Sequence, residues 1–149
     1  MEQLEAKPVA KFAHDPFPSP TGEAFVFGPR QTAWLEALES GKYSQASGML
    51  KNPTSGAYCC LGVLCEVEGL VFDPQGFIFS TGAGNGYLTN EYAKGIGLKA
   101  GMGTLEHVAR LDDMAYSSLG QMNDSWNFGF KDIAAYIRHD PWNVFDHSA

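Results

Sequence analysis

Apolar residues recur three or four positions apart in two segments of the chain, and this spacing is typical of amphipathic helices. The first segment is 30–40, where Trp34 and Leu38 share one face. The Gly28-Pro29 step in front of it favours a helix start, because proline fits the first helical turn. The second segment is 129–139, and its apolar stripe consists of Phe130, Ile133, Ala134 and Ile137. Both segments are predicted to be helices with one buried face.

A third apolar segment, the run YCCLGVLC, carries no charge. Periodicity alone does not separate a buried strand from a buried helix over so short a run. Cys60 and Leu64 keep helical spacing, and Gly69 stands where a helix stop is expected. We therefore predict a helix over 59–68, in which Gly62 lets a neighbouring element approach closely.

The strand signals lie in the middle of the chain. The turn Asp73-Pro74-Gln75-Gly76 has β-prone residues on both sides, which predicts a hairpin over about 70–80. Tyr87 and Leu88 follow a glycine-rich turn and are predicted to add a third strand. Segment 104–111 fits a strand or a helix equally well.

Capping signals predict two shorter helices. Asn90 to Gly95 reads as a short helix that ends at its glycine. Ser118 followed by Gln121 matches a capping box, in which both side chains satisfy amides at a helix start. Pro141 is expected to stop the last helix.

Together these elements predict the α+β class and a single compact domain over 1–149. A small antiparallel sheet, the hairpin at about 70–80, packs with helices over about 30–40, 59–68 and 129–139. Five prolines within the first 29 residues predict an irregular arm over 1–29. The phenylalanines of this arm indicate that it packs on the core.

Composition and charge narrow the function classes. A net charge of −7 works against binding nucleic acid, because Lys and Arg supply that affinity. No apolar run approaches the ~20 residues of a membrane span, and the first residues lack the pattern of a secretory signal. Cys59 and Cys60 are adjacent, so a disulfide between them would be strained. We expect a cytoplasmic protein with reduced cysteines.

No constellation in the sequence points to catalysis, and the chain is expected to need no metal or cofactor. Gly95 to Gly101 is glycine-rich but lacks the strand, helix and spacing of a phosphate loop. Glu106-His107 and Asp112-Asp113 read as solvated surface charge rather than a metal site. The cysteines read as core sulfur, since an apolar environment raises a thiol pKa.

Uncharged polar and aromatic residues between the apolar elements form a candidate ligand set. Aromatic walls with a few fixed polar groups are how small planar molecules are held. In the alternative reading, the tyrosines pack in the core and the Asn-Asp pair is only a turn. The predicted wall and donor groups are Tyr43, Gln45, Tyr58, Asn123, Asp124 and Trp126. The residues predicted to face a phosphate are Arg30, Lys42 and Lys51.

The order of these segments resembles a family of small bacteriophage and prophage proteins. The resemblance rests on a Trp helix leading into SGKYSQ, then Gly48 and Leu50, the YCCLGVLC run, and LGQMND before an Ile-Ala helix. It covers roughly 30–138, and YCCLGVLC is its specific part.

The resemblance implies an accessory protein that acts against host defence in the host cytoplasm. The expected function is to bind and sequester a small nucleotide-like signalling molecule, without catalysis. Two alternatives stay open: an inhibitor that binds a host defence protein, and a hydrolase of the same nucleotide class. The low surface charge permits a homo-oligomer.

Overall fold

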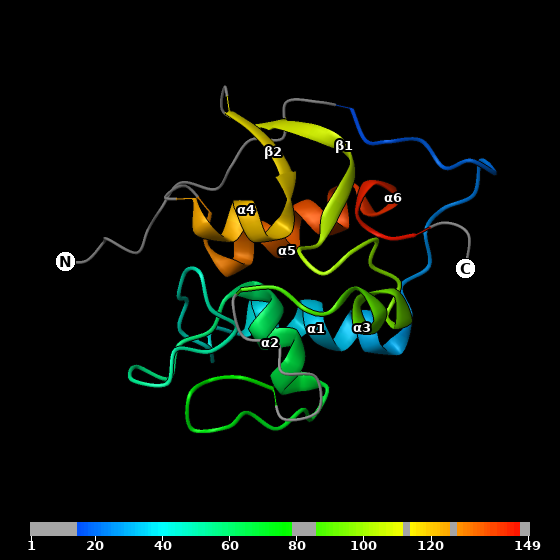
Figure 1. Cartoon of the computed structure of the whole chain (residues 1–149). Coiled ribbons are helices and arrows are strands. Elements are labelled where there is room, and N and C mark those ends of the chain that lie inside the picture. The colour runs from blue at the N-terminus through cyan, green and yellow to red at the C-terminus, as the bar shows by residue number, and fades with distance from the viewer. Residues whose placement is uncertain (1–14, 79–85, 112–113, 126–127, 147–149) are drawn as a thin grey trace.

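A computed structural model describes residues 15–78, 86–111, 114–125 and 128–146 of the 149-residue chain (Figure 1). Within these ranges the elements in chain order are α1 (Pro29–Ser40), α2 (Cys60–Val67), α3 (Asn90–Gly95), β1 (Thr104–Leu111), β2 (Met114–Ser118), α4 (Leu119–Asp124), α5 (Phe130–His139) and α6 (Pro141–Val144). The predicted α+β class is confirmed.

The elements form layers around one hydrophobic core. In Figure 1 the β1–β2 sheet lies on one side of α4 and α5, and α1 and α2 lie on the other side. Buried side chains from α1, α2, α4, α5 and β1 join a single cluster. Among the described residues no helix is both long enough and apolar enough to cross a membrane.

The predicted helix at 30–40 is α1, and its ends follow local chemistry. Pro29 is its first residue, and Gly41 after its end has φ of +80°, a left-handed conformation that favours glycine. The indole N–H of Trp34 donates to the carbonyl of Cys60 at 2.9 Å. This buried bond joins α1 to the start of α2.

The cysteine run forms helix α2, as predicted, and it is the most buried helix of the fold. Its residues from Cys60 to Cys65 are all buried. The Cys59 sulfur accepts a hydrogen bond from the amide of Gly62, so a thiol caps the helix. A side chain at Gly62 would collide with the carbonyl of Leu50, which confirms the predicted close approach.

The named strands of the structure lie outside the predicted hairpin at about 70–80. The Asp73–Gly76 turn forms, with the Gly76 amide donating to the Asp73 carbonyl. Within the described residues its flanks share the bond from the Asp73 amide to the Phe77 carbonyl and one bridge between Phe72 and Ile78. The named strands of the described residues are β1 and β2, which pair antiparallel with Leu111 opposite Met114. Residues 79–80 of the predicted hairpin lie outside the described residues.

Segment 104–111 is a strand whose burial alternates, except at the exposed His107, and whose inner face meets the helices. Leu105, Ala109 and Leu111 are buried while Glu106 and Val108 are exposed. Helical periodicity does not produce this alternation. Within this strand the pairing register with β2 shifts between Thr104 and Ala109.

The short helices α3 and α4 agree with their capping signals, whereas one predicted strand and one helix differ from the prediction. α3 ends at Gly95 as predicted, and the Ser118 hydroxyl accepts the Gln121 amide at the start of α4. The third strand predicted at Tyr87–Leu88 is not formed within the described residues, where the Leu88 amide donates to the Gly101 carbonyl at 2.9 Å. Pro141 follows the end of α5 as predicted, but it also begins α6, which the sequence reasoning missed.

The described part of the arm, residues 15–28, is irregular and lies along the molecule beside α1 and α6. The Phe17 amide donates to a carboxylate oxygen of the buried Asp140 at 2.6 Å. Phe25 and Phe27 pack against the core cluster. The arm is therefore held at both ends of its described length, before it enters α1.

Candidate functional site

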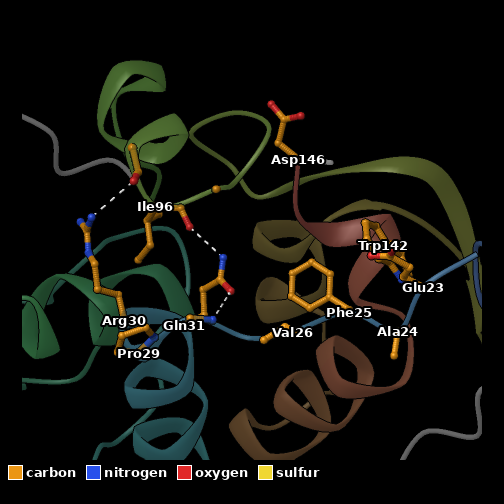
Figure 2. A pocket seen from close by; sticks show the side chains of 13 residues that line it. Glu23, Ala24, Phe25, Val26, Pro29, Arg30, Gln31, Ile96, Trp142 and Asp146 are labelled. Carbon is orange, nitrogen blue, oxygen red and sulfur yellow. Dashed lines mark hydrogen bonds between the residues drawn. The ribbon is translucent and has the colours of Figure 1, made fainter. Parts of the chain in front are cut away.

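A cavity of about 490 Å³ lies where the arm enters α1 (Figure 2). Three parts of the chain that are distant in sequence form its walls. They are the arm with the first turn of α1, the loop after α3, and the C-terminal region around α6. We call it the arm cavity, and it is lined by Glu23, Ala24, Phe25, Val26, Gly28, Pro29, Arg30, Gln31, Gly95, Ile96, Gly97, Trp142 and Asp146.

Gln31 holds two of these walls together. Its side-chain oxygen accepts the amide of Gly28 at 3.0 Å, and its side-chain nitrogen donates to the carbonyl of Ile96 at 3.1 Å. The next residue, Gly97, has φ of +97°, and a Cβ there would lie 2.9 Å from the same nitrogen. Glycine is needed at this point for both reasons. The side-chain amide of Gln31 is therefore a structural link, through its oxygen and one of its two N–H groups.

Phe25 supplies an aromatic wall. Its ring stacks on Phe145 at 5.3 Å between ring centroids, and it meets Trp142 and Phe27 edge-on at 5.0 and 4.9 Å. Aromatic clusters of this geometry stabilise the side chains that form them. The arm thus contributes a ring that is fixed in place from three directions.

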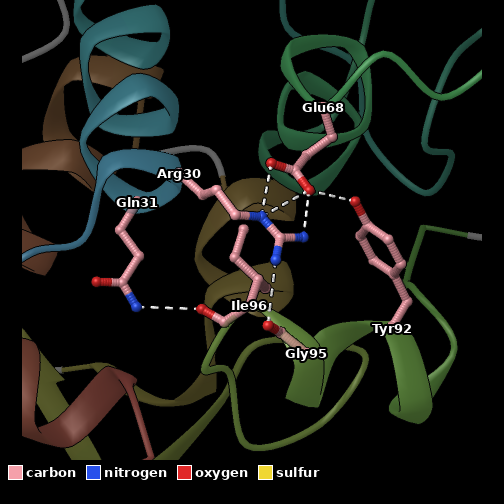
Figure 3. A network of polar contacts seen from close by, with 6 residues as sticks. All are labelled: Arg30, Gln31, Glu68, Tyr92, Gly95 and Ile96. Carbon is pink, nitrogen blue, oxygen red and sulfur yellow. Dashed lines mark hydrogen bonds and ion pairs between the residues drawn. The ribbon is translucent and has the colours of Figure 1, made fainter.

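Arg30 provides the positive charge of the cavity and belongs to a polar network (Figure 3). Its Nε lies 3.1 Å from each carboxylate oxygen of Glu68, and Nη1 donates to the carbonyl of Gly95 at 3.3 Å. The hydroxyl of Tyr92 donates to the same carboxylate. The network therefore joins α1, the end of α2 and α3.

The electrostatics of the network follow from these contacts. The Arg30 guanidinium lowers the pKa of Glu68, whose carboxylate it binds. Burial and then the hydrogen bond to Glu68 raise the pKa of Tyr92 to about 12. Glu68 in turn raises the pKa of Arg30. The charged pair is thus intact over the neutral pH range.

Arg30 keeps donors available for a ligand. Its side chain is 51% exposed, whereas that of Glu68 is 10% exposed. The bonds within the described residues leave one N–H on each terminal nitrogen of the guanidinium. Figure 2 shows Arg30 at one side of the cavity, Glu23 and Trp142 at the other, and Phe25 between them. The cavity is therefore polarised from end to end.

Four of the sequence-predicted ligand residues come together at a different place. Tyr43 and Tyr58 meet edge-on at 5.5 Å, and the Lys42 ammonium lies 5.8 Å from the Tyr43 ring centre. Lys51 lies 5.4 Å from the Tyr58 ring centre and 5.3 Å from that of Phe72. All three lysine–ring contacts are within cation–π range. Tyr58 is mostly buried, and its hydroxyl donates to Glu66.

Gln45, Asn123 and Asp124 also come together, but mainly to bind one another and the backbone. The Asn123 side-chain oxygen accepts from Gln45 Nε2 and from the Cys60 amide, both at 3.0 Å. Its nitrogen donates to the Ala46 carbonyl at 2.8 Å and to Asp124 at 3.1 Å. We call this group the amide latch.

The remaining predicted residues are placed as follows. Asp124 accepts the amide of Gly48 and also lines a separate hollow of about 350 Å³. Arg30 lies in the arm cavity, away from the other predicted residues. Trp126 lies outside the described residues. We call Lys42, Tyr43, Lys51 and Tyr58 the tyrosine–lysine cluster. The predicted set is thus divided among the arm cavity, this cluster and the amide latch.

Sequence reasoning missed the residues that define the arm cavity apart from Arg30. Phe25 was assigned only to packing, and Trp142 was not considered. The glycine-rich segment after α3 was noted, and two of its residues, Gly95 and Gly97, do line the cavity. A proline-rich arm with regularly placed aromatics, followed by a glycine-proline helix start, was the signal that could have located it.

The cysteines and the acidic pairs do not form an additional site in the described residues. Burial raises the pKa of Cys59 to about 11 and that of Cys65 to about 12, so their thiols are poor nucleophiles. All three cysteines are free thiols. Among the described residues no group of three or more His, Cys, Asp or Glu side chains is arranged to hold a metal ion. Asp112 and Asp113 lie outside those residues.

Residues 30–70 match the model of a family described as a domain of unknown function (DUF8296). The matched segment includes α1, α2 and the tyrosine–lysine cluster, together with Arg30 and Glu68 of the polar network. It does not include the arm or the C-terminal wall of the cavity. Comparison with curated proteins and with solved structures finds no match for the chain.

Proposed function

We propose that the chain binds a small nucleotide-like molecule in the arm cavity and holds it without chemical change. The observation that carries this proposal is the combination, in one cavity of about 490 Å³, of the fixed aromatic rings Phe25 and Trp142 with the half-exposed guanidinium of Arg30. A cavity of this size suits a drug-sized ligand.

The two sides of the cavity suit the two parts of such a ligand. A planar base packs against the ring edges and faces of the aromatic wall. Its amino groups would find an acceptor in the carboxylate of Glu23, which lies on the same side as Trp142 (Figure 2). An anionic group would take the free donors of Arg30 and the positive end of the α1 dipole, since α1 begins at Pro29.

The biological role in this proposal is sequestration. The segment order resembles phage accessory proteins, and a phage protein that binds a host signalling nucleotide would withhold it from the defence system that it activates. The protein would act in the host cytoplasm. Arg30, predicted from the sequence to face a phosphate, lines this cavity.

The test is a binding measurement on the full chain. Protein purified from a bacterial host is denatured by heat, and the released small molecules are identified by mass spectrometry. Calorimetric titration then uses a panel of adenine and guanine nucleosides, cyclic mononucleotides, cyclic dinucleotides and nucleoside phosphates. We expect an intact nucleotide to be released and at least one panel member to bind.

Arg30→Gln and Arg138→Gln form a matched pair of variants for this test. Arg138 makes a similar surface pair with Glu39, at 2.6 Å, and is 44% exposed, but it does not line the arm cavity. We expect Arg30→Gln to weaken binding about tenfold or more, because it removes charge-assisted hydrogen bonds, and Arg138→Gln to leave it unchanged. Equal effects of the two variants would refute the assignment of the site.

Two other outcomes would replace the proposal. Recovery of a cleaved nucleotide would identify a hydrolase. Failure of every panel member to bind, together with no released molecule, would end the small-molecule proposal and leave inhibition of a host protein as the function to test.

A further inference from the structure

We infer that Glu68 sets the charge selectivity of the arm cavity, so that its preferred ligand carries a single negative charge, as a phosphodiester does. This inference rests on the proposed function. It names the ligand class within it: nucleotides whose phosphate is esterified twice, in preference to phosphate monoesters and polyphosphates.

The first step is that the charge of Arg30 is already neutralised by the carboxylate of Glu68, which is fixed in place. Glu68 is bound by Nε and Nη2 of Arg30 and also by the hydroxyl of Tyr92. Its side chain is 10% exposed, and its residue caps the C-terminus of α2. The carboxylate is therefore held from two sides, by α1 and by α3, and stays beside the guanidinium when a ligand binds.

The second step is that Arg30 still donates but adds no net charge to the cavity. Two N–H groups of the guanidinium are unused within the described residues, and half of the side chain is exposed. Of the described residues that line the cavity, Arg30 is the one that carries a positive charge. A ligand anion thus meets directed hydrogen-bond donors next to a neutral ion pair.

The third step concerns the opposite side of the cavity. Glu23 lies there, beside Trp142, and a second carboxylate, that of Asp146, also lines the cavity (Figure 2). Each additional negative charge on a ligand would be repelled by Glu23, Asp146 and Glu68 without a further cation to compensate it among the described lining residues. The cavity therefore favours an anion of the lowest charge that still accepts the Arg30 donors.

The ionisation of phosphate esters relates this charge preference to a class of ligand. A phosphate monoester carries about 1.5 to 2 negative charges at neutral pH, whereas a diester lacks the second ionisation. Nucleoside polyphosphates carry still more. A cyclic mononucleotide carries one negative charge in total and presents its base for stacking.

The test is a ligand series that changes charge while it keeps the base. The wild-type full chain is titrated with adenosine, adenosine 3′,5′-cyclic monophosphate, AMP and ATP at constant ionic strength, and then with the guanine series. We expect the cyclic monophosphate to bind about tenfold or more tightly than AMP of the same base, and ATP to bind most weakly. A wild-type protein that binds AMP or ATP more tightly than the cyclic monophosphate would overturn the inference.

Glu68→Gln tests the cause of the selectivity. This variant removes the charge and keeps a side chain of similar shape, so we expect AMP and ATP to gain affinity relative to the cyclic monophosphate. The matched control is Glu39→Gln, which removes the carboxylate of the Arg138 pair outside the cavity and should leave the ratios unchanged. Equal weakening of all ligands by Glu68→Gln would indicate a purely structural role for Glu68 and overturn the inference.

The wild-type ranking decides the question even if Glu68→Gln fails to fold, which its thermal unfolding curve would reveal. The two proposals fail differently. Binding without a preference for the singly charged ligand refutes the charge selectivity alone. Absence of binding in both base series and for the cyclic dinucleotides refutes the proposed function itself.

Discussion

Asn123 has a structural use that its sequence context does not reveal. An asparagine amide offers two donors and two acceptor positions, and all of them are used within the amide latch. The side chain is 2% exposed and joins α4 to the link before Tyr58 and to the first turn of α2. A ligand would have to displace one of these bonds, which favours a structural role for Asn123.

Asn123→Ala is expected to lower the free energy of unfolding by about 3 kcal/mol, because it leaves the buried amide of Cys60 and the carbonyl of Ala46 without their partner. Urea unfolding measures the change. Gln75→Ala is the control, since Gln75 is exposed and should alter stability by less than about 0.5 kcal/mol. Lost ligand affinity with unchanged stability would instead assign Asn123 to a binding site.

At the scale of elements, the packing of α2 depends on one glycine. A Cβ at Gly62 would lie 1.7 Å from the carbonyl oxygen of Leu50, so the helix and the preceding chain touch backbone to backbone. The same Leu50 carbonyl accepts a hydrogen bond from the Cys59 amide. Any side chain at this position forces α2 away from the link that carries the tyrosine–lysine cluster.

Gly62→Ala is therefore expected to destabilise the protein by about 3 kcal/mol or more, the upper range for overpacking in a core. Gly95→Ala is the matched control within a helix, because nothing lies within 4 Å of its added Cβ. It should change stability by about 1 kcal/mol at most, with a gain expected from a less flexible unfolded chain. Thermal and urea unfolding of both variants measure the difference. Similar stabilities for the two would contradict the close approach.

At the scale of the whole molecule, long-range contacts produce both the cavity and the core. The arm reaches the C-terminal region through Phe17 on Asp140 and through Phe25 on Trp142 and Phe145. The three thiols lie at the centre of the core, with exposures of 1% or less. Burial is the largest cause of their raised pKa values. Thiol reactivity therefore reports on opening of the whole fold.

We expect the native protein to react slowly with a disulfide exchange reagent at about pH 8, and all three thiols to react at once in concentrated urea. A single fast-reacting thiol in the native protein would contradict this expectation.

Folding raises the thiol pKa values above the unfolded value of about 8.5. Their contribution to stability is thus complete below that pH and is lost as the pH rises toward about 11. Unfolding free energies from pH 8 to 10 should fall accordingly. Unfolding free energies that stay constant from pH 8 to 10 would contradict this pH dependence.

The sequence predicted the elements whose causes are local. Helices α1, α2 and α5 follow from apolar spacing and from their Gly and Pro ends, and the Ser118 cap of α4 depends on residues three positions apart. The Asp73 turn also formed. Within the described residues its flanks pair through the Phe72–Ile78 bridge, and the neighbouring Val71 is 62% exposed, so little burial rewards a longer pairing there.

The sheet and the site required information that no short segment contains. The apolar and polar residues of 104–111 did not separate a strand from a helix. In the fold this segment pairs with β2 and contacts α6, and these contacts determine which of its faces is buried. Arg30 was recognised as a phosphate-binding candidate, but its partner Glu68 is 38 positions away. Phe25 and Trp142 lie at opposite ends of the chain.

The sequence by itself therefore determined the α+β class, the three main helices, and the burial of the cysteine helix, since periodicity, caps and hydrophobicity act within a few residues of one another. Only the tertiary structure decided which polar residues are consumed by internal bonds and which remain available to a ligand. That distinction depends on contacts between distant segments, such as Asn123 with Cys60 and Arg30 with Glu68. It is these contacts that separate the amide latch from the arm cavity.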